Sequence, residues 1–511
     1  MTDDVRIHQL FDRAAKAHPD RPAVTDWTGR TLSYGALDQL IVRTIAELAA
    51  MGLRPGDRLL IVSENAASLP ALLLSASRMD AVAVPVNARM TAPELAKIAD
   101  HTEPRLTLFL SDVSDPARDH AMAAGARPVE LAGGALHVAG PFEVDPEAVE
   151  PDARMTAVIL YTTGTTGMPK GVMLTHGNLI FGGRSSARLR GIVPTDRIYG
   201  VLPMTHVFGL TSMACAGLSS GAHLTLVPRF NAGAVLDALL DGVTVLPAVP
   251  QMHAAIMAEA RLRGLERLDG PLRYVSSGAA PLDPDWKRRA EDFYGIALQN
   301  GYGMTETTAG VTITVNEKGD PDPSAGIPLP GAQIAIDESV GREPGTGEVL
   351  TRGPHVMRGY FRNGQATAQV LSADGWMRTG DLGRMDPQGR LHIVGRCKEL
   401  IIRGGFNVYP PEVEAALNDH PAVLQAAVIG RRRDGGDEDI LAFCQLSGAS
   451  PVTEAQLAEH AAARLSPYKR PSRILICGPL PAAATGKILK HRLIEHFADL
   501  LATPEDAATG G

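Results

Sequence analysis

The stretch of sequence that decides the fold is Tyr161-Thr162-Thr163-Gly164-Thr165-Thr166-Gly167-Met168-Pro169-Lys170-Gly171. It overlaps the end of a short apolar run, residues 157–161, which is typical of a buried strand. Its glycines allow the backbone to approach an anion closely, its threonines add hydroxyl donors, and its lysine adds a cation. We therefore predict a phosphate-binding loop that directly follows a strand.

Two common phosphate-binding motifs do not fit this chain. A P-loop requires Gly-x4-Gly-Lys-Ser/Thr, but counting from Gly164 places Pro169 at the second glycine and Gly171 at the hydroxyl position. A dinucleotide-binding motif would begin at Gly301, but its third glycine position holds Glu306, whose charge would repel a pyrophosphate. The sequence therefore predicts neither a P-loop NTPase nor a dinucleotide-binding protein.

Short apolar runs alternate with helical patterns on both sides of the loop. The runs cover residues 58–63, 81–86, 105–110, 157–161, 223–227, 243–248 and 272–276. Such alternation predicts an α/β fold with parallel sheets covered by helices. Between residues 331 and 394, β patterns punctuated by glycine replace it, which predicts the hairpins of a small β region.

Beyond a boundary near Gly395 and Arg396 the chain has its own apolar periodicity. There we expect helices at 411–418, 453–465 and 487–500 and strands at 423–429, 440–446 and 472–477. A chain of 511 residues exceeds what one hydrophobic core supports. We predict a multi-layered N-terminal domain (1–395), a hinge (396–399), a smaller α+β domain (400–502) and a flexible tail (503–511), with the functional site in the cleft between the domains.

Composition excludes several classes of protein. Hydrophobic residues make up 45% and charged residues 21% of the chain, as in folded globular proteins. The formal net charge of −8 argues against a nucleic-acid binder or a polybasic membrane anchor. The four cysteines lack CxxC spacing, so we expect no zinc site, no disulfide framework and a reducing, cytoplasmic setting. The most apolar stretch, 207–227, contains glycines and predicts a buried helix and strand rather than a membrane span.

Together with later motifs, the loop resembles the signature of the ATP-dependent adenylate-forming superfamily of acyl-CoA synthetases, aryl-CoA ligases, adenylation domains and beetle luciferases. The later motifs follow in that family's order: Ser277-Gly278-Ala279-Ala280-Pro281, Gly301-Tyr302-Gly303-Met304-Thr305-Glu306, Arg378-Thr379-Gly380-Asp381 and Thr485-Gly486-Lys487. The resemblance covers nearly the whole chain. It implies a large layered domain and a small C-terminal domain that rotates between two half-reactions.

The resemblance also implies roles around the nucleotide. Lys487 matches the catalytic lysine that bridges the substrate carboxylate and the α-phosphate of ATP. Tyr302 matches the residue that lies on adenine, Thr305 matches one that contacts the α-phosphate, and Glu306 matches the ligand of Mg²⁺, an ion that prefers oxygen. The other expected ATP or AMP contacts are Thr162, Thr163, Gly164, Thr165, Thr166, Gly167, Lys170, Gly278, Ala279, Ala280, Asn300, Gly301, Gly303, Asp381 at the ribose hydroxyls, Arg396 beside it, and Lys398 at the hinge.

The second half-reaction needs a thiol, and the resemblance implies coenzyme A. His206 matches a residue whose ring swings to admit the carboxylate or the pantetheine arm. Expected contacts of CoA are Arg229, Gly404 and Gly405, and the expected acyl pocket comprises Phe208, Gly209, Ser212, Met213, Met304 and Thr308. Malonyl-CoA synthetases carry an arginine where Gly301 stands here, and Arg229 is the single cation near the pocket segments. We therefore expect an apolar monocarboxylate, fatty or aromatic, as substrate.

We thus predict an AMP-forming acid:CoA ligase that uses ATP, Mg²⁺ and CoA and releases pyrophosphate and AMP. Two alternatives stay open: an adenylation enzyme that loads the phosphopantetheine arm of a carrier protein, and a degenerate nucleotide sensor, which the presence of Lys487, Glu306 and Asp381 disfavours. Thr163, which stands where 4-coumarate ligases have serine, weakens assignment to that group. We expect small-molecule partners, no nucleic acid and no integral membrane association. Further expectations are a homodimer and a protein acetyltransferase acting on Lys487.

Overall fold

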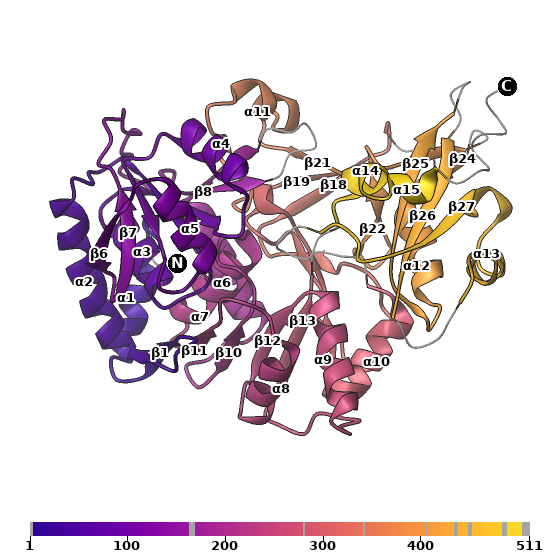
Figure 1. Cartoon of the computed structure of the whole chain (residues 1–511), viewed down its shortest axis with the longest axis horizontal. Coiled ribbons are helices and arrows are strands. Elements are labelled where there is room, and N and C mark those ends of the chain that lie inside the picture. The colour runs from indigo at the N-terminus through magenta and orange to yellow at the C-terminus, as the bar shows by residue number, and fades with distance from the viewer. Residues whose placement is uncertain are drawn as a thin grey trace.

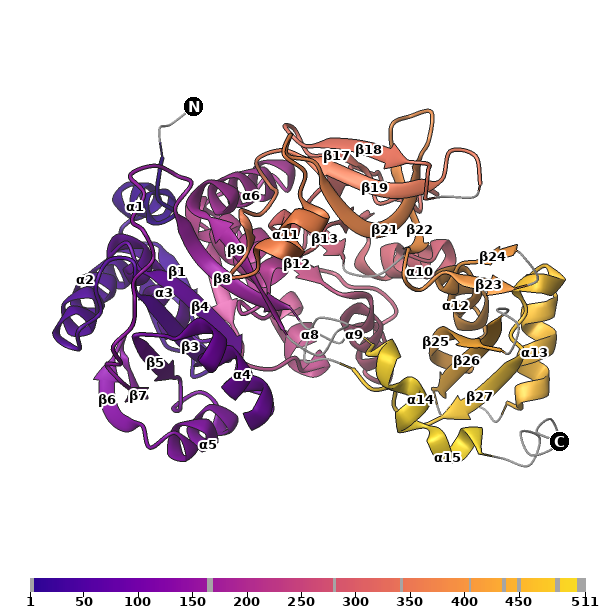
Figure 2. The same ribbon diagram turned by 90° about the horizontal axis from the view of Figure 1, so that it is seen from above.

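The computed structural model describes residues 4–162, 169–278, 282–340, 343–403, 406–433, 438–447, 452–482 and 488–502. A large N-terminal part with sheets and helices in several layers lies beside a smaller C-terminal part, at right in Figure 1 and in the turned view of Figure 2. The predicted α/β class is confirmed: two large sheets with helices, a smaller β region and an α+β C-terminal part.

The first large sheet contains the two strands that flank the predicted phosphate loop. Its order is β20-β9-β8-β4-β3-β5-β7-β6. The bounds are β3 (Arg58–Ser63), β4 (Val82–Asn87), β5 (Leu106–Phe109), β6 (Arg127–Leu131), β7 (Gly134–Ala139), β8 (Thr156–Thr162), β9 (Lys170–Thr175) and β20 (Gly359–Tyr360). The central strands β3, β4, β5 and β8 are parallel, and the outer strands are antiparallel. Every residue of β3 is buried, as a strand covered on both faces requires.

The second large sheet has the order β14-β13-β12-β10-β11-β1-β2. Its strands are β1 (Pro22–Thr25), β2 (Thr31–Ser33), β10 (Arg197–Gly200), β11 (His223–Leu226), β12 (Val245–Ala248), β13 (Tyr274–Ser277) and β14 (Leu298–Gln299). All pairs except β1 with β2 are parallel. The carboxyl ends of these strands therefore lie at one edge of the sheet, where Gly278 and Asn300 follow β13 and β14.

The helices of the N-terminal part connect these strands. They are α1 (His8–Ala17), α2 (Tyr34–Ala50), α3 (Ser68–Arg78), α4 (Ala92–Thr102), α5 (Asp115–Ala123), α6 (His176–Leu189), α7 (Ala216–Ser219), α8 (Ala232–Leu240), α9 (Pro250–Leu262), α10 (Pro284–Tyr294), α11 (Gly364–Val370) and the π-helix η1 (Phe208–Cys215). Local signals set their starts: the Ser33 hydroxyl accepts the Ala36 N–H to begin α2.

Two smaller sheets lead from the N-terminal part toward the predicted hinge. One contains β15 (Gly301–Tyr302), β16 (Thr312–Ile313) and β17 (Ile327–Pro328), with the 3₁₀ turn η2 (Thr305–Thr307) between its first two strands. The other contains β18 (Gln333–Asp337), β19 (Gly347–Arg352), β21 (Met377–Met385) and β22 (Leu391–Arg396). Gly389, in the turn from β21 to β22, has a φ of +74°, which favours glycine. These are the hairpins predicted from the glycine punctuation.

The C-terminal part is built on the sheet β25-β26-β27 and the hairpin β23-β24. Its elements are β23 (Ile401–Arg403), β24 (Phe406–Val408), α12 (Pro410–Asn418), β25 (Val423–Arg432), β26 (Glu438–Leu446), α13 (Glu454–Ala462), η3 (Pro467–Lys469), β27 (Arg473–Cys477), η4 (Lys490–Arg492), α14 (Leu493–His496) and α15 (Ala498–Leu501). Apolar clusters of the described chain lie either before residue 367 or after residue 400. The predicted hinge at 396–399 falls between them.

The helix predicted over residues 487–500 is confirmed only in part: the described portion is helical from Lys490 onward, but in short pieces, and its first residues are not helical. Ile488 forms an isolated bridge with Ala482 instead, and the Leu489 N–H donates to the Pro481 carbonyl. Three short helical turns, η4, α14 and α15, follow. Leu493, Phe497 and Leu501 recur with helical spacing because they pack on the C-terminal sheet. That spacing does not reveal the pairing of Ile488 with Ala482, and this pairing prevents the start of the segment from being helical.

The apolar stretch 207–227 forms the π-helix η1, then α7 and β11, so the predicted helix and strand are confirmed. Within the described ranges, no helix combines the length and apolar character needed to cross a membrane.

Three buried histidines make the fold sensitive to acid. Burial lowers the pKa of His176 to about 3 and the pKa values of His253 and His355 to about 4, from 6.5. Below pH 6.5 the unfolded chain takes up protons that the folded chain excludes, so each histidine lowers the free energy of unfolding by about 1.4 kcal/mol per pH unit until its folded pKa is reached.

We therefore expect the urea midpoint to fall steadily between pH 6.5 and pH 4. His355→Gln should flatten this dependence, whereas the control His496→Gln, at an exposed position, should not. Equal midpoints at pH 7 and pH 5 would contradict the assignment.

Candidate active site

Tyr302, Asp381 and Arg396, all predicted nucleotide contacts, meet where β15 of one small sheet approaches β21 and β22 of the other. The Tyr302 hydroxyl donates to Asp381 Oδ2 at 2.7 Å. Antiparallel pairing of β21 with β22 sets Arg396 opposite Asp381, and Arg396 Nε lies 3.1 Å from Asp381 Oδ1. Burial and the adjacent Asp381 carboxylate raise the pKa of Tyr302 well above its usual value, so the tyrosine remains a donor. The buried carboxylate of Asp381 thus connects Tyr302, which is expected at the adenine, with Arg396, which is expected near the ribose.

Glu306 is held by a tyrosine that the sequence reasoning missed. The Tyr360 hydroxyl, at the end of β20, donates to Glu306 Oε1 at 2.9 Å, and both side chains are buried. The Glu306 main-chain carbonyl accepts the Met357 N–H at 2.8 Å. Burial, and then the charge of Glu306, raise the pKa of Tyr360, which keeps the phenol protonated. Only an aromatic residue after a glycine marked this position in the sequence, and such a pair is common in strands.

Lys170 connects Glu306 to the predicted phosphate loop. Lys170 begins β9 opposite Thr162, the last residue of β8, so the ends of the loop are fixed by strand pairing. Its ammonium group lies 4.7 Å from the centroid of the Tyr360 ring. Lys170, Tyr360 and Glu306 therefore form a continuous row from the loop to the predicted metal ligand.

The surroundings of Glu306 suit Mg²⁺. Within the described ranges no three His, Cys, Asp or Glu side chains gather as a metal site. Mg²⁺ is commonly bound by one or two carboxylates together with phosphates and waters, so a single buried carboxylate in the same row as Lys170, at the end of the predicted phosphate loop, fits this ion.

Removing the Tyr360 hydroxyl tests this arrangement. We expect Tyr360→Phe to lower kcat/KM of adenylation about 10-fold, because Glu306 loses a hydrogen bond to its charged group, and to raise the Mg²⁺ concentration needed for half-maximal rate. Tyr199→Phe, at another buried tyrosine, is the matched control. An unchanged Mg²⁺ dependence in Tyr360→Phe would show that the hydroxyl does not position Glu306.

His206 lies in the segment between β10 and η1, and Asn65 fixes that segment. The Asn65 side chain donates to the carbonyls of Gly200 and Leu202 and accepts the Met204 N–H at 2.8 Å. The Phe208 N–H donates to His206 Nδ1 at 3.3 Å, which places the proton of the neutral ring on Nε2. Asn65 follows β3 of the other large sheet, so His206 is positioned by contacts between the two sheets.

The predicted acyl-pocket residues fall into two groups. Phe208, Gly209, Ser212 and Met213 belong to the π-helix η1, an irregularity that often occurs at functional sites. Met304 and Thr308 flank η2. The groups approach each other at Gly182 of α6, where a Cβ atom would meet Thr211 of η1 and the Thr308 carbonyl. Gly278 adjoins the first group: a Cβ atom there would lie 3.2 Å from Cε1 of Phe208.

Two other predicted residues, Asn300 and Gly303, have local structural roles. The Asn300 N–H donates to Thr314 Oγ1 at 2.7 Å, and its side chain donates to the Ser324 carbonyl. A Cβ atom at Gly303 would collide with the Ala309 carbonyl, so the glycine is required by the backbone that presents Glu306.

Arg229 lies at a buried carboxylate together with a second arginine that the sequence reasoning missed. Arg229 Nε and Arg89 Nε are 3.3 Å and 3.2 Å from Glu64 Oε1. Glu64 follows β3, Arg89 follows β4 and Arg229 follows β11, so both sheets contribute. The side chain of Arg229 is 59% exposed, whereas that of Glu64 is 1% exposed. The buried carboxylate of Glu64 therefore holds both arginines in place, while the Arg229 side chain stays accessible to solvent.

Lys398 is exposed in the turn that follows β22. The next residue, Glu399, pairs with Lys490 at 3.0 Å, and Lys490 also pairs with Glu414 of α12 at 2.7 Å. These ion pairs tie the C-terminal segment to the turn at the predicted hinge.

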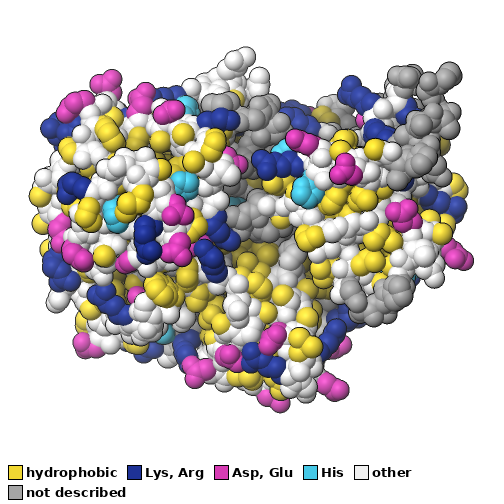
Figure 3. Space-filling model, in the orientation of Figure 1, with side chains coloured by type: hydrophobic (Ala, Val, Ile, Leu, Met, Phe, Trp, Pro, Cys, Tyr) yellow, Lys and Arg dark blue, Asp and Glu magenta, His cyan; other side chains and the backbone are white. Residues whose placement is uncertain are grey.

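The surface is hollowed between the two parts of the molecule (Figure 3).

Ten predicted site residues lie outside the described residues: Thr163, Gly164, Thr165, Thr166, Gly167, Ala279, Ala280, Gly404, Gly405 and Lys487. The ends of two of these segments are nevertheless fixed, by the pairing of Thr162 with Lys170 and by the bridge between Ala482 and Ile488.

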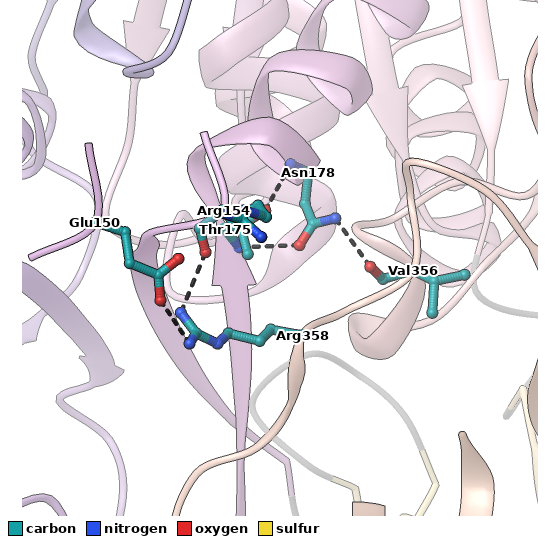
Figure 4. A pocket seen from close by; sticks show the side chains of 6 residues that line it. All are labelled: Glu150, Arg154, Thr175, Asn178, Val356 and Arg358. Carbon is teal, nitrogen blue, oxygen red and sulfur yellow. Dashed lines mark hydrogen bonds and ion pairs between the residues drawn. The ribbon is translucent and has the colours of Figure 1, made fainter. Parts of the chain in front are cut away.

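A surface cavity of about 500 Å³ lies at the opposite end of β9 from Lys170 (Figure 4). Its lining residues are Glu150, Arg154, Thr175, Asn178, Val356 and Arg358. Arg358 pairs with Glu150 at 2.6 Å across it, and the Asn178 amide donates to the Val356 carbonyl. Because none of the predicted site residues lines this cavity, we assign neither the nucleotide nor the acyl group to it.

Comparison with known proteins agrees with the resemblance. The family model described as "AMP-binding enzyme" matches residues 11–361, and "AMP-binding enzyme C-terminal domain" matches residues 412–487. The chain is 33% identical to 4-coumarate–CoA ligase 5 of Oryza sativa subsp. japonica, over 96% of this chain and 94% of the relative.

Solved structures are similar over the whole length. ATP-bound MatB from Rhodopseudomonas palustris is 30% identical with a TM-score of 0.83, over 96% of this chain and 99% of that one. O-succinylbenzoate coenzyme A synthetase from Bacillus subtilis, in complex with ATP and magnesium, is 29% identical with a TM-score of 0.81, over 95% and 98%. ATP, Mg²⁺ and CoA are accordingly the small molecules this enzyme uses. The chain belongs to the AMP-binding enzyme family, within its acid:CoA ligase branch, and is an AMP-forming acyl-CoA synthetase.

Proposed function

We propose that the protein activates a carboxylic acid with an apolar body, aromatic or fatty, and transfers the acyl group to free CoA. The observation that carries this proposal is the buried Asp381 carboxylate, which binds both Tyr302 and Arg396. It supports a site for the nucleoside of ATP next to Glu306 and Lys170.

In the first half-reaction a carboxylate oxygen of the acid attacks the α-phosphorus of ATP. The new bond is a mixed anhydride, and the bond to the β-phosphate breaks, so pyrophosphate leaves. Lys170 and the loop before it bind the phosphates, Thr305 contacts the α-phosphate, and Lys487 bridges the two reacting anions. A cation is needed there because both reactants are negative.

The metal neutralises phosphate charge when it is bound. Glu306 would hold it, and the Tyr360 hydroxyl fixes the position of the Glu306 carboxylate through its hydrogen bond to Oε1. The contact between Tyr360 and Lys170 keeps the metal ligand and the phosphate-binding lysine in one row.

In the second half-reaction the CoA sulfur attacks the acyl carbonyl carbon, the thiol proton passes to solvent, the bond between the acyl carbon and the phosphate oxygen breaks, and AMP leaves. We propose that His206 gates the entry of the carboxylate and the pantetheine arm, and that Arg229, with Arg89, binds phosphate of CoA. Rotation about 396–399 would then replace Lys487 by the segment containing Gly404 and Gly405. The ion pair of Lys490 with Glu399 is a contact that such a rotation must accommodate, because Lys490 belongs to the C-terminal part and Glu399 to the predicted hinge.

The experiment combines two assays on the full chain. A panel of fatty and aromatic acids is tested in ATP–pyrophosphate exchange, and each acid that supports exchange is then given free CoA or a holo carrier protein. We expect exchange with at least one acid and acyl-CoA formation with free CoA. Transfer to the carrier protein alone would contradict the choice of acceptor, and absence of exchange with every acid would contradict the proposed function.

A further inference from the structure

Arg190 is a buried cation beside the predicted acyl pocket. It directly follows α6 and is 7% exposed. Its Nη1 donates to the Ser212 carbonyl of η1. Its guanidinium carbon lies 6.0 Å from the centroid of the Phe208 ring and 5.6 Å from that of the Tyr274 ring. Two predicted pocket residues, Phe208 and Ser212, therefore contact this side chain.

The charge of Arg190 has no carboxylate counterpart in the described part of the chain. The other buried cations there each have one: Arg6 with Asp80, Arg58 with Glu147, Arg105 with Asp57, and Lys287 with Glu291. Arg190 Nε is buried without a hydrogen-bond partner among the described residues. Burying an unpaired charge is costly, so a cation in this state calls for an anion from elsewhere.

Several hydroxyl groups on the neighbouring elements are also buried without a hydrogen-bond partner among the described residues. The Tyr274, Ser276 and Ser277 hydroxyls of β13 and the Thr211 hydroxyl of η1 are buried without a partner in the described ranges. β13 and η1 are the two elements whose residues contact Arg190. Of these four, the Tyr274 hydroxyl belongs to a ring that contacts Arg190, so a polar group of a ligand bound at Arg190 would find an unpartnered hydroxyl on that ring.

The position of Arg190 relative to the nucleotide site follows from Phe208. One edge of the Phe208 ring adjoins Gly278, which is predicted to lie between the adenine and the acyl group. The guanidinium group of Arg190 contacts the same ring. A substrate that reacts near Gly278 and runs past Phe208 would bring its far end toward Arg190.

We propose that Arg190 binds a second carboxylate of the substrate, so that the acid is a dicarboxylate with an apolar spacer. The inference rests on the proposed function and narrows its substrate. A guanidinium group binds a planar carboxylate through parallel hydrogen bonds, and its Nε is available for one of them. The proposed substrate keeps the apolar body expected from the sequence, but it carries two carboxylates where the sequence predicted one.

The test compares monocarboxylates with dicarboxylates of equal carbon number in ATP–pyrophosphate exchange: hexanoate with adipate, octanoate with suberate, and benzoate with terephthalate. For the pair that fits the spacer, we expect the wild-type kcat/KM to be at least about 10-fold higher for the dicarboxylate. Arg190→Met should lower kcat/KM for that dicarboxylate about 100-fold, because its second charge is buried unpaired, while the matched monocarboxylate is unchanged or improved.

Arg190→Lys keeps the charge and should fall between wild type and Arg190→Met, which guards against a folding defect of the methionine variant. Thermal unfolding gives a second readout: the dicarboxylate should raise the Tm of the wild type more than that of either variant. Exchange with monocarboxylates but no dicarboxylate, or an equal loss for both members of each pair in Arg190→Met, would overturn the inference and leave the proposed function standing. Exchange with none of the acids would overturn both.

Discussion

Replacing Lys487 by alanine should lower the rate of adenylation about 1,000-fold and leave the transfer of a pre-formed acyl-adenylate to CoA largely intact. Adenylation brings a carboxylate against a triphosphate, and loss of the cation that bridges them removes charge stabilisation in the transition state. Thioester formation has no such pair of anions. ATP–pyrophosphate exchange measures the first step, and CoA thioester formation from synthetic acyl-adenylate measures the second.

Lys318→Ala is the matched control, because Lys318 is a surface lysine whose nearest carboxylate partner, Asp292, is 3.7 Å away. It should leave both rates unchanged. Equal losses of the two half-reactions in Lys487→Ala would contradict the division of labour between Lys487 and the segment at Gly404 and Gly405.

Asp381→Ala should raise the KM for ATP about 100-fold. The buried Asp381 carboxylate binds Tyr302 at 2.7 Å and Arg396 at 3.1 Å, so its removal leaves both side chains without their shared acceptor and takes away the predicted acceptor of the ribose hydroxyls. Asp381→Asn retains the shape and one acceptor oxygen and should have a smaller effect. Initial rates of pyrophosphate release at varied ATP concentration give the KM.

Asp374→Ala provides the control for Asp381. Asp374 lies in an exposed turn of the same β region, and the side-chain hydrogen bond that its carboxylate accepts in the described chain comes from the nearby Ser372 hydroxyl. A KM for ATP that rises equally in both variants, or in neither, would remove Asp381 from the nucleotide site.

The sequence predicts the strands best where they are buried on both faces. Residues 58–63 coincide with β3, and the predicted run 243–248 contains β12; every residue of both strands is buried. A strand inside a covered parallel sheet needs apolar residues at every position, and such a run bounded by glycine, proline or charge is visible without knowledge of its neighbours. The glycine-punctuated hairpins of β18 to β22 are visible for a similar local reason.

Features that depend on distant partners were not predictable. Tyr360 follows Glu306 by more than fifty residues and contacts it only because β20 pairs with β9. Arg89 and Arg229 meet through Glu64, which follows a third strand. Arg190 precedes the segments expected to line the acyl pocket and reaches them because α6 packs beside η1. The bridge of Ala482 with Ile488 likewise overrides a helical pattern.

The order of the two half-reactions is the central claim, and a rapid-quench single turnover tests it most directly. The full chain is mixed with ATP, Mg²⁺ and an acid that supports pyrophosphate exchange, and CoA is added after a delay. We predict that one acyl-adenylate per enzyme accumulates before CoA is added and that it is converted to acyl-CoA and AMP in equal amounts afterwards. Accumulation of an adenylate that CoA fails to discharge, or release of ADP in place of AMP, would contradict the account.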